Sequence, residues 1–95
     1  MITVIVEHYL NEEGKTVFSS WVNELKKILK PYKGYVSLDQ LIDVEDESRT
    51  LLELKFENME LLRYWSKSKE HDQAIAQLLE YRIKKQKSQV FKYKK

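Results

Sequence analysis

Apolar and polar residues alternate along four stretches of the chain, which is the pattern of strands with one buried face. In the first stretch, Ile2, Val4 and Val6 share a face with His8. The opposite face of this stretch also carries apolar side chains, so we expect both of its faces to be covered. The alternation predicts strands over residues 1–9, 35–44, 49–57 and 89–93.

Between these strands, apolar residues recur three and four positions apart, as on one face of an α-helix. Pro31 and Gly34 mark the end of the first helical segment, because proline disfavours helical geometry at the residue before it. Asn58 can cap a short second helix through its side-chain oxygen. The spacing predicts helices over about residues 15–30, 58–65 and 68–85.

Apart from the short helix, the element order is β-α-β-β-α-β, the ferredoxin-like arrangement of the α+β class. We expect a four-stranded antiparallel sheet with the helices on one face, in a single domain spanning residues 1–95. The other face would expose too much apolar surface, so we predict a homodimer in which two sheets pack together as a dimeric α+β barrel. The apolar residues expected on that face are Ile5, Tyr9, Tyr35, Leu41, Leu51 and Phe91.

The composition excludes several classes of function. The chain has no cysteine, which rules out disulfides and thiolate chemistry, and its net charge of only +2 gives no argument for a nucleic-acid partner. The predicted third strand also lacks the aromatic pattern on which RNA-recognition modules of this element order stack bases. No apolar run is long enough to cross a bilayer. We therefore expect a cytoplasmic protein that binds neither nucleic acid nor membrane.

The stretch from Leu52 to His71 concentrates the residues that suggest chemistry. A strand leads directly into a short helix that starts after Asn58 and ends at Trp65, and His71 follows after a polar break. An indole ring offers a flat wall with an N–H donor, and an imidazole can act as a base because it titrates near neutral pH.

With these features the chain resembles the antibiotic-biosynthesis-monooxygenase family of the dimeric α+β barrel superfamily. The resemblance implies a homodimer with one cleft per subunit, between the helices and the sheet. It also implies a candidate activity: cofactor-free oxygenation of phenols or quinols, haem degradation, or isomerisation of small aldehydes. The matching positions are the strand 2–9, then Gly14, Lys15, Phe18, Trp21, Gly34, Tyr35, residues 54–56, residues 65–68 and His71.

Cofactor-free oxygenation needs a dry site and a base that removes a proton from an electron-rich substrate. On this basis we predict an enzyme that oxygenates a small aromatic or quinol-like molecule. The predicted catalytic residues in the implied cleft are His71, His8 and Trp65. The predicted substrate-binding residues are Trp21, Asn58 and Tyr32.

No metal and no cofactor are expected. In the haem-degrading relatives a histidine on the last helix binds the iron, and this chain has Ile75 in that region. Two separate histidines without carboxylates at ligand spacing do not make a metal site.

Structural roles are the alternative for each of these residues. Aromatic residues at helical spacing are more often part of a core, and Asn58 already has a role as a helix cap. The alternative function is a non-catalytic dimeric module that binds a small hydrophobic ligand.

Overall fold

The structure is a computed structural model that describes residues 1–94. The strands are β1 (Ile2–Leu10), β2 (Tyr35–Leu41), β3 (Thr50–Phe56) and β4 (Arg82–Lys92). The helices are α1 (Glu12–Leu29), α2 (Met59–Ser66) and α3 (Lys69–Ala76), and a 3-10 turn (Leu79–Tyr81) precedes β4. No helix in this described part of the chain combines the length and the apolarity needed to span a membrane.

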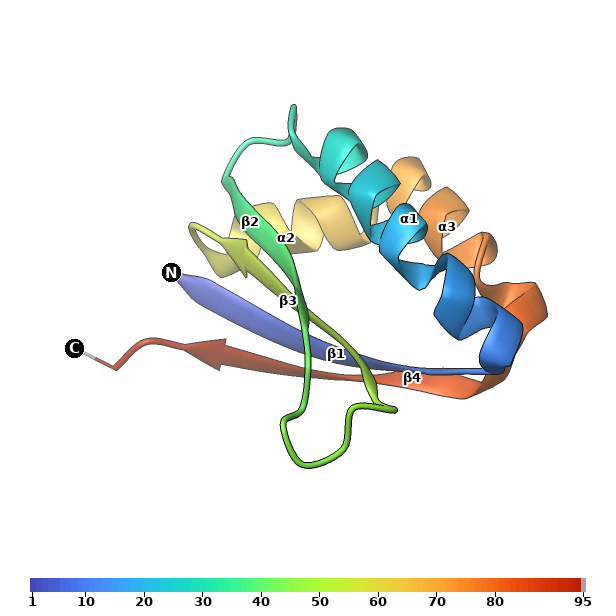
Figure 1. Ribbon diagram of the computed structural model, residues 1–95. Coiled ribbons are helices and arrows are strands. Elements are labelled where there is room, and N and C mark those ends of the chain that lie inside the picture. Colours follow the sequence, from blue (N-terminus) through green and yellow to red (C-terminus); the bar gives the residue numbers. More distant parts are fainter. Residues whose placement is uncertain (95) are drawn as a thin grey trace.

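The four strands form one antiparallel sheet in the order β2-β3-β1-β4, and the three α-helices lie on one of its faces (Figure 1). This arrangement confirms the predicted α+β, ferredoxin-like fold. Within one chain the sheet is open, with β2 and β4 as its edges. The two termini lie at the same end of the sheet (Figure 1), because Ile2 of β1 is paired with Lys92 of β4.

The hydrophobic core lies between the sheet and the helices. Register explains which strand residues reach it: Val4 is paired with Leu54 on one side and with Val90 on the other, so all three lie on the helix-covered face. Phe18 of α1 and Phe56 of β3 are almost completely buried there. The apolar faces of the strands and of the helices therefore pack against each other in one core.

Helix α1 begins three residues earlier than the sequence pattern predicts. The side chain of Asn11 accepts a hydrogen bond from the backbone N–H of Gly14 at 2.8 Å, so Asn11 is the N-cap and Glu12 starts the helix. Gly14 also allows a close approach, since a Cβ atom there would lie 2.6 Å from Cβ of Tyr81. Residues 12–14, which the prediction leaves outside the helix, therefore belong to its first turn.

Strand β2 contains a bulge that reverses the predicted side of one aromatic residue. The pairing with β3 shifts between Tyr35 and Ser37, which leaves Val36 as the extra residue. As a result, Tyr35 packs at the edge of the core with its ring centroid 6.3 Å from that of Phe56. The prediction that Tyr35 lies on the outer sheet face is therefore wrong.

The boundary between the last helix and the last strand was also predicted incorrectly. Helix α3 ends at Ala76, and β4 begins at Arg82 instead of residue 89. The lysine-rich segment 82–88 has little local preference for a strand, but it pairs along β1, with Glu7 opposite Lys87 and Tyr9 opposite Lys84. The Nζ atom of Lys84 lies 4.2 Å from the centroid of the Tyr9 ring. Long-range pairing therefore outweighs local propensity here.

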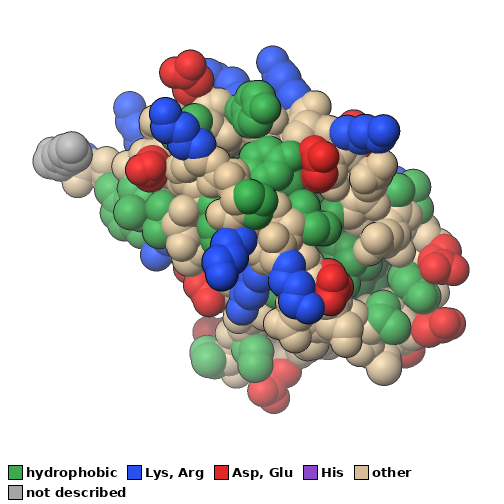
Figure 2. Space-filling model, turned by 90° about the horizontal axis from the view of Figure 1, so that it is seen from above, with side chains coloured by type: hydrophobic (Ala, Val, Ile, Leu, Met, Phe, Trp, Pro, Cys, Tyr) green, Lys and Arg blue, Asp and Glu red, His purple; other side chains and the backbone are tan. Residues whose placement is uncertain are grey.

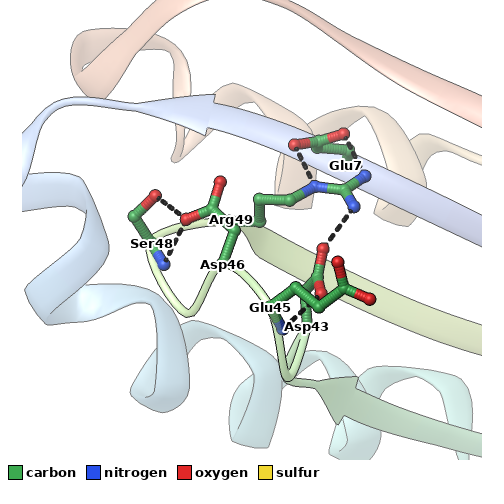
Figure 3. A network of polar contacts seen from close by, with 6 residues as sticks. All are labelled: Glu7, Asp43, Glu45, Asp46, Ser48 and Arg49. Carbon is green, nitrogen blue, oxygen red and sulfur yellow. Dashed lines mark hydrogen bonds and ion pairs between the residues drawn. The ribbon is translucent and has the colours of Figure 1, made fainter.

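On the outer side of the sheet, Arg49 ties the β2–β3 loop to β1 (Figure 3). Its Nε and Nη2 atoms donate to the carboxylate of Glu7 at 3.0 and 2.8 Å, and its Nη1 donates to Asp43 at 2.7 Å. In the same loop, Ser48 donates to Asp46 through both its backbone N–H and its hydroxyl. Hydrogen bonds from Arg49 lower the pKa values of Glu7 and Asp43 below their usual range. Arg49 thus holds the acidic β2–β3 loop against β1.

Candidate functional site

A cavity of about 280 Å³ lies between the helix-covered face of the sheet and the helices. Most of its lining is apolar, and all three α-helices contribute to it. The apolar lining residues are Val4, Val6, Trp21, Leu25, Leu38, Leu52, Leu54, Met59, Leu62, Trp65, Ala74, Ile75 and Val90. The polar lining residues are His8, Arg63, Ser66, His71, Gln86 and Ser88.

His8 is the buried polar group on the sheet side of the cavity. It follows Ile2, Val4 and Val6 on the helix-covered face of β1, and it is only 4% exposed. Its ring packs against Phe18 and Trp21, with centroid distances of 5.5 Å to each.

The His8 ring is neutral near pH 7. Burial lowers its pKa from 6.5 to about 4, and the positive charge of Arg82 acts in the same direction. No described residue forms a hydrogen bond with its ring nitrogens. The ring therefore offers a hydrogen-bonding group to a molecule in the cavity, although its low pKa makes it a weak base.

The two tryptophans differ in how their indole N–H groups are used. Trp21 donates to the backbone carbonyl of Ala74 at 2.9 Å, in a buried contact that joins α1 to α3. Trp65 is 3% exposed, and its N–H donates no hydrogen bond within residues 1–94. Among residues 1–94, the Thr3 hydroxyl is the only side-chain polar atom that is completely buried and lacks a hydrogen-bond partner. The Trp65 nitrogen, which also lacks a partner, is therefore not completely buried. Trp65 is thus the tryptophan whose donor remains available.

His71 lies beside Trp65 at the start of α3. The Ser68 side chain caps this helix by accepting from the backbone N–H of His71 at 3.1 Å. The imidazole stands edge-on to Trp65, with ring centroids 5.4 Å apart and an interplanar angle of 86°. Its Nδ1 lies 3.3 Å from a carboxylate oxygen of Asp72, and its side chain is 31% exposed. His71 therefore lines the cavity where solvent can reach it.

Asn58 and Tyr32 lie outside the cavity lining. The Asn58 side chain accepts from the backbone N–H of Leu61 at 2.9 Å, which occupies it as the N-cap of α2. The hydroxyl of Tyr32 donates to Glu70 at 2.6 Å, and this carboxylate raises the pKa of Tyr32. The Tyr32 ring packs edge-on against Trp65 at 4.9 Å. Of the six residues singled out from the sequence, the cavity brings together His8, Trp21, Trp65 and His71.

Strand β4 and helix α2 contribute polar lining residues that were not predicted from the sequence. Gln86 and Ser88 alternate with Val90 on the inner face of β4, a period-two signal that was missed because residues 86–88 fell between the predicted helix 68–85 and the predicted strand 89–93. Arg63 and Ser66 flank Trp65 on α2. Within residues 1–94, no three His, Cys, Asp or Glu side chains are grouped closely enough to hold a metal ion.

Comparison with known proteins finds similarity in structure alone. No protein-family model matches the chain, and no curated protein matches its sequence. A structure of a conserved protein from Methanosarcina mazei superposes with a TM-score of 0.85 at 14% identity, over 98% of this chain and 92% of that one. A structure described as an antibiotic biosynthesis monooxygenase gives a TM-score of 0.81 at 10% identity, with both chains fully covered.

A mutant of SnoaB, a cofactor-independent oxygenase from Streptomyces nogalater, is also similar, with a TM-score of 0.75 at 10% identity. That match covers 99% of this chain and 93% of the other. The chain thus has the fold of antibiotic-biosynthesis-monooxygenase domains. At these identities the similarity defines the fold, and any function has to be argued from the cavity.

Proposed function

We propose that the protein is a cofactor-independent monooxygenase that acts on a small aromatic molecule of the hydroquinone or anthrone type. The observation that carries the proposal is the cavity, which combines apolar walls with two imidazoles and a free indole N–H. Ligand sites usually measure about 300–1,000 Å³, so this cavity, which is just below that range, suits a small ligand. The oxygenase named among the structural neighbours supports the same class of reaction.

His71 is the proposed base. When its Nδ1 donates to Asp72, the other ring nitrogen becomes the acceptor that can take a proton from the substrate and later return it. His8 is proposed to hold the substrate oxygen by a hydrogen bond, and Trp65 to form the flat wall against which the aromatic ring lies. The apolar lining keeps the reacting carbon dry.

The proposed reaction uses molecular oxygen as the oxidant and needs no external reductant. His71 takes a proton from the activated CH2 group of an anthrone, and the resulting carbanion gives its electrons to O2, forming a C–O bond. The peroxide oxygen recovers the proton from His71. Loss of the second C–H proton together with hydroxide then breaks the O–O bond. One oxygen atom remains as the product carbonyl, and the other leaves as water.

We also propose that two copies associate through the outer face of the sheet. Phe91 is 51% exposed on this face, and it neighbours the half-buried Ile5 along the strands. A stable interface buries at least about 1,000 Å² in total. Light scattering should give twice the chain mass of 11.5 kDa. Phe91→Glu should give the monomer mass, and a monomer for the parent protein would refute the association.

A non-catalytic module that binds a small ligand is the second candidate. It is favoured by His8, whose low pKa makes it a weak base and which has no carboxylate partner among the described residues. The module would use the same cavity but consume no oxygen.

Oxygen uptake with a panel of hydroquinones and anthrones distinguishes the two functions. We expect the parent protein to consume one O2 per product, and His71→Ala to lower the rate by about 100-fold or more. Lys69→Ala is the matched control, since Lys69 lies on the same helix outside the cavity lining. Ligand binding without oxygen uptake on any substrate would support the binding module instead.

A further inference from the structure

Arg63 contributes a charged guanidinium to the cavity lining, and this charge is not paired with any of residues 1–94. It lies on α2 two residues before Trp65, and it is exposed. Its backbone carbonyl accepts hydrogen bonds from Ser66 and Lys67 at the end of the helix. Its guanidinium forms no hydrogen bond or ion pair with any of residues 1–94, whereas that of Arg49 has three hydrogen bonds. Arg63 therefore has donors free for a ligand.

The charged groups around the cavity are mainly basic, and the Asp72 carboxylate, 3.3 Å from Nδ1 of His71, is the nearby acidic group that the site residues contact. None of its lining residues is an aspartate or a glutamate. Arg82 acts on the cavity from the β4 side, where its charge disfavours protonation of His8. Over the helix-bearing face as a whole, acidic and basic side chains are interspersed (Figure 2), so no general field selects one sign of ligand. Any preference for an anion therefore depends on groups at the cavity itself.

We propose that Arg63 determines specificity by binding a carboxylate substituent of the aromatic ligand. The aromatic ring lies in the cavity against Trp65, and the carboxylate remains at the solvent side, where the guanidinium meets it. A planar guanidinium suits a carboxylate because two parallel N–H groups can donate to its two oxygens. This inference rests on the proposed ligand site and assigns the substrate class to aromatic carboxylic acids.

Calorimetric titration with 2-naphthoate and its neutral analogue 2-naphthamide tests this inference at low ionic strength. The parent protein should bind naphthoate about 5-fold more tightly than naphthamide, which is the effect expected of one exposed charged contact. Arg63→Gln should remove this preference, because the affinity for naphthoate should fall to that for naphthamide measured with the same variant. The preference of the parent protein should also decrease as salt is added.

Lys67→Gln is the matched control, because Lys67 is an exposed cation at the end of the same helix but outside the cavity lining. It should keep the parent's preference for naphthoate. Equal affinities of the parent protein for both ligands, or equal losses in the two variants, would overturn the role of Arg63 and leave the ligand site standing. Failure of both ligands to bind would overturn the ligand site and, with it, this inference.

Discussion

Glu7 and His8 are neighbours on β1, yet their side chains lie on opposite faces of the sheet in opposite chemical situations. Glu7 accepts two hydrogen bonds from Arg49 and is held ionised. His8 lines the cavity, neutral and without a hydrogen-bonding partner among residues 1–94. The polar groups of the outer network bond one another, whereas the His8 ring and the Trp65 N–H at the cavity have no hydrogen-bonding partner among residues 1–94. A hydrogen-bonding group that has no partner inside a cavity indicates a ligand site more strongly than a group that is already bonded within a surface network.

The apolar residues of the two faces show the same contrast. Phe56 is completely buried beneath the helices, while Phe91 on the outer face is half exposed. Phe56 therefore contributes to the stability of the single chain, whereas the exposed half of the Phe91 side chain can contact another molecule.

The largest expected effect separates these two phenylalanines. Phe56→Ala should destabilise the fold by about 3–5 kcal/mol, because it leaves a cavity in a packed core. Phe91→Ala should cost a much smaller amount, since half of its side chain is already in solvent. Urea unfolding of both variants at a concentration where the parent is monomeric checks the difference. Equal losses would contradict the assignment of the core to the helix-covered face.

His8 should make stability depend on pH. Its pKa is lowered from the ordinary 6.5 to about 4 in the folded chain, so the unfolded state binds the proton first as pH falls. Stability is fully present above about pH 6.5 and should decrease by roughly 3 kcal/mol as the pH approaches 4. His8→Phe should remove this part of the decrease in urea unfolding at a series of pH values.

Arg82→Gln provides a control for the cause of this pKa shift. Removing its charge should diminish the pH dependence only slightly, because burial is the larger cause. A His8→Phe profile identical to that of the parent would show that His8 is not buried as a neutral ring.

The two tryptophans should respond differently to the loss of their N–H groups. Trp21→Phe should cost about 1–3 kcal/mol beyond the change in packing, because it leaves the buried carbonyl of Ala74 without its donor. Trp65→Phe breaks no hydrogen bond within the described chain and should cost about 1 kcal/mol. Thermal unfolding monitored by circular dichroism measures both, and a larger loss for Trp65→Phe would assign it to the core.

The smallest effect is expected at the outer network. Arg49→Met removes the hydrogen bonds that lower the pKa values of Glu7 and Asp43. Because those carboxylates contribute stability above the pKa values that they have in the unfolded chain, the variant should be less stable than the parent near pH 7. The two should converge as the pH falls through the lowered pKa values. High salt should also diminish the difference, and a difference unaffected by pH and salt would show that the network contributes no charge interaction.

Much of the fold followed from local patterns, while the corrected parts depend on contacts distant in sequence. The alternation of Ile2, Val4 and Val6 was sufficient to predict β1. By contrast, the bulge that places Tyr35 toward Phe56 depends on pairing with β3. The lysine-rich part of β4 has little local preference for a strand, and it becomes one because β1 provides its pairing partner.

The residues of the candidate site show the same difference between what local sequence predicts and what tertiary contacts decide. His8 was placed by the period of its strand, and Trp65 and His71 by their nearness in sequence. Asn58 and Tyr32 were chosen for their chemistry, but their polar groups are used by Leu61 and Glu70. Whether a donor or acceptor is already occupied depends on tertiary contacts, which the sequence does not contain.

The central claim is that the cavity between the helices and the sheet binds a small aromatic molecule. The chain has two tryptophans, so its two indole N–H signals in a ¹H–¹⁵N spectrum report on the cavity during titration with 2-naphthol. We predict a saturable shift of the Trp65 signal, and a smaller shift for Trp21 because its N–H is bonded to Ala74. No saturable change in either signal, or changes confined to the backbone around Phe91 on the outer face, would contradict the claim.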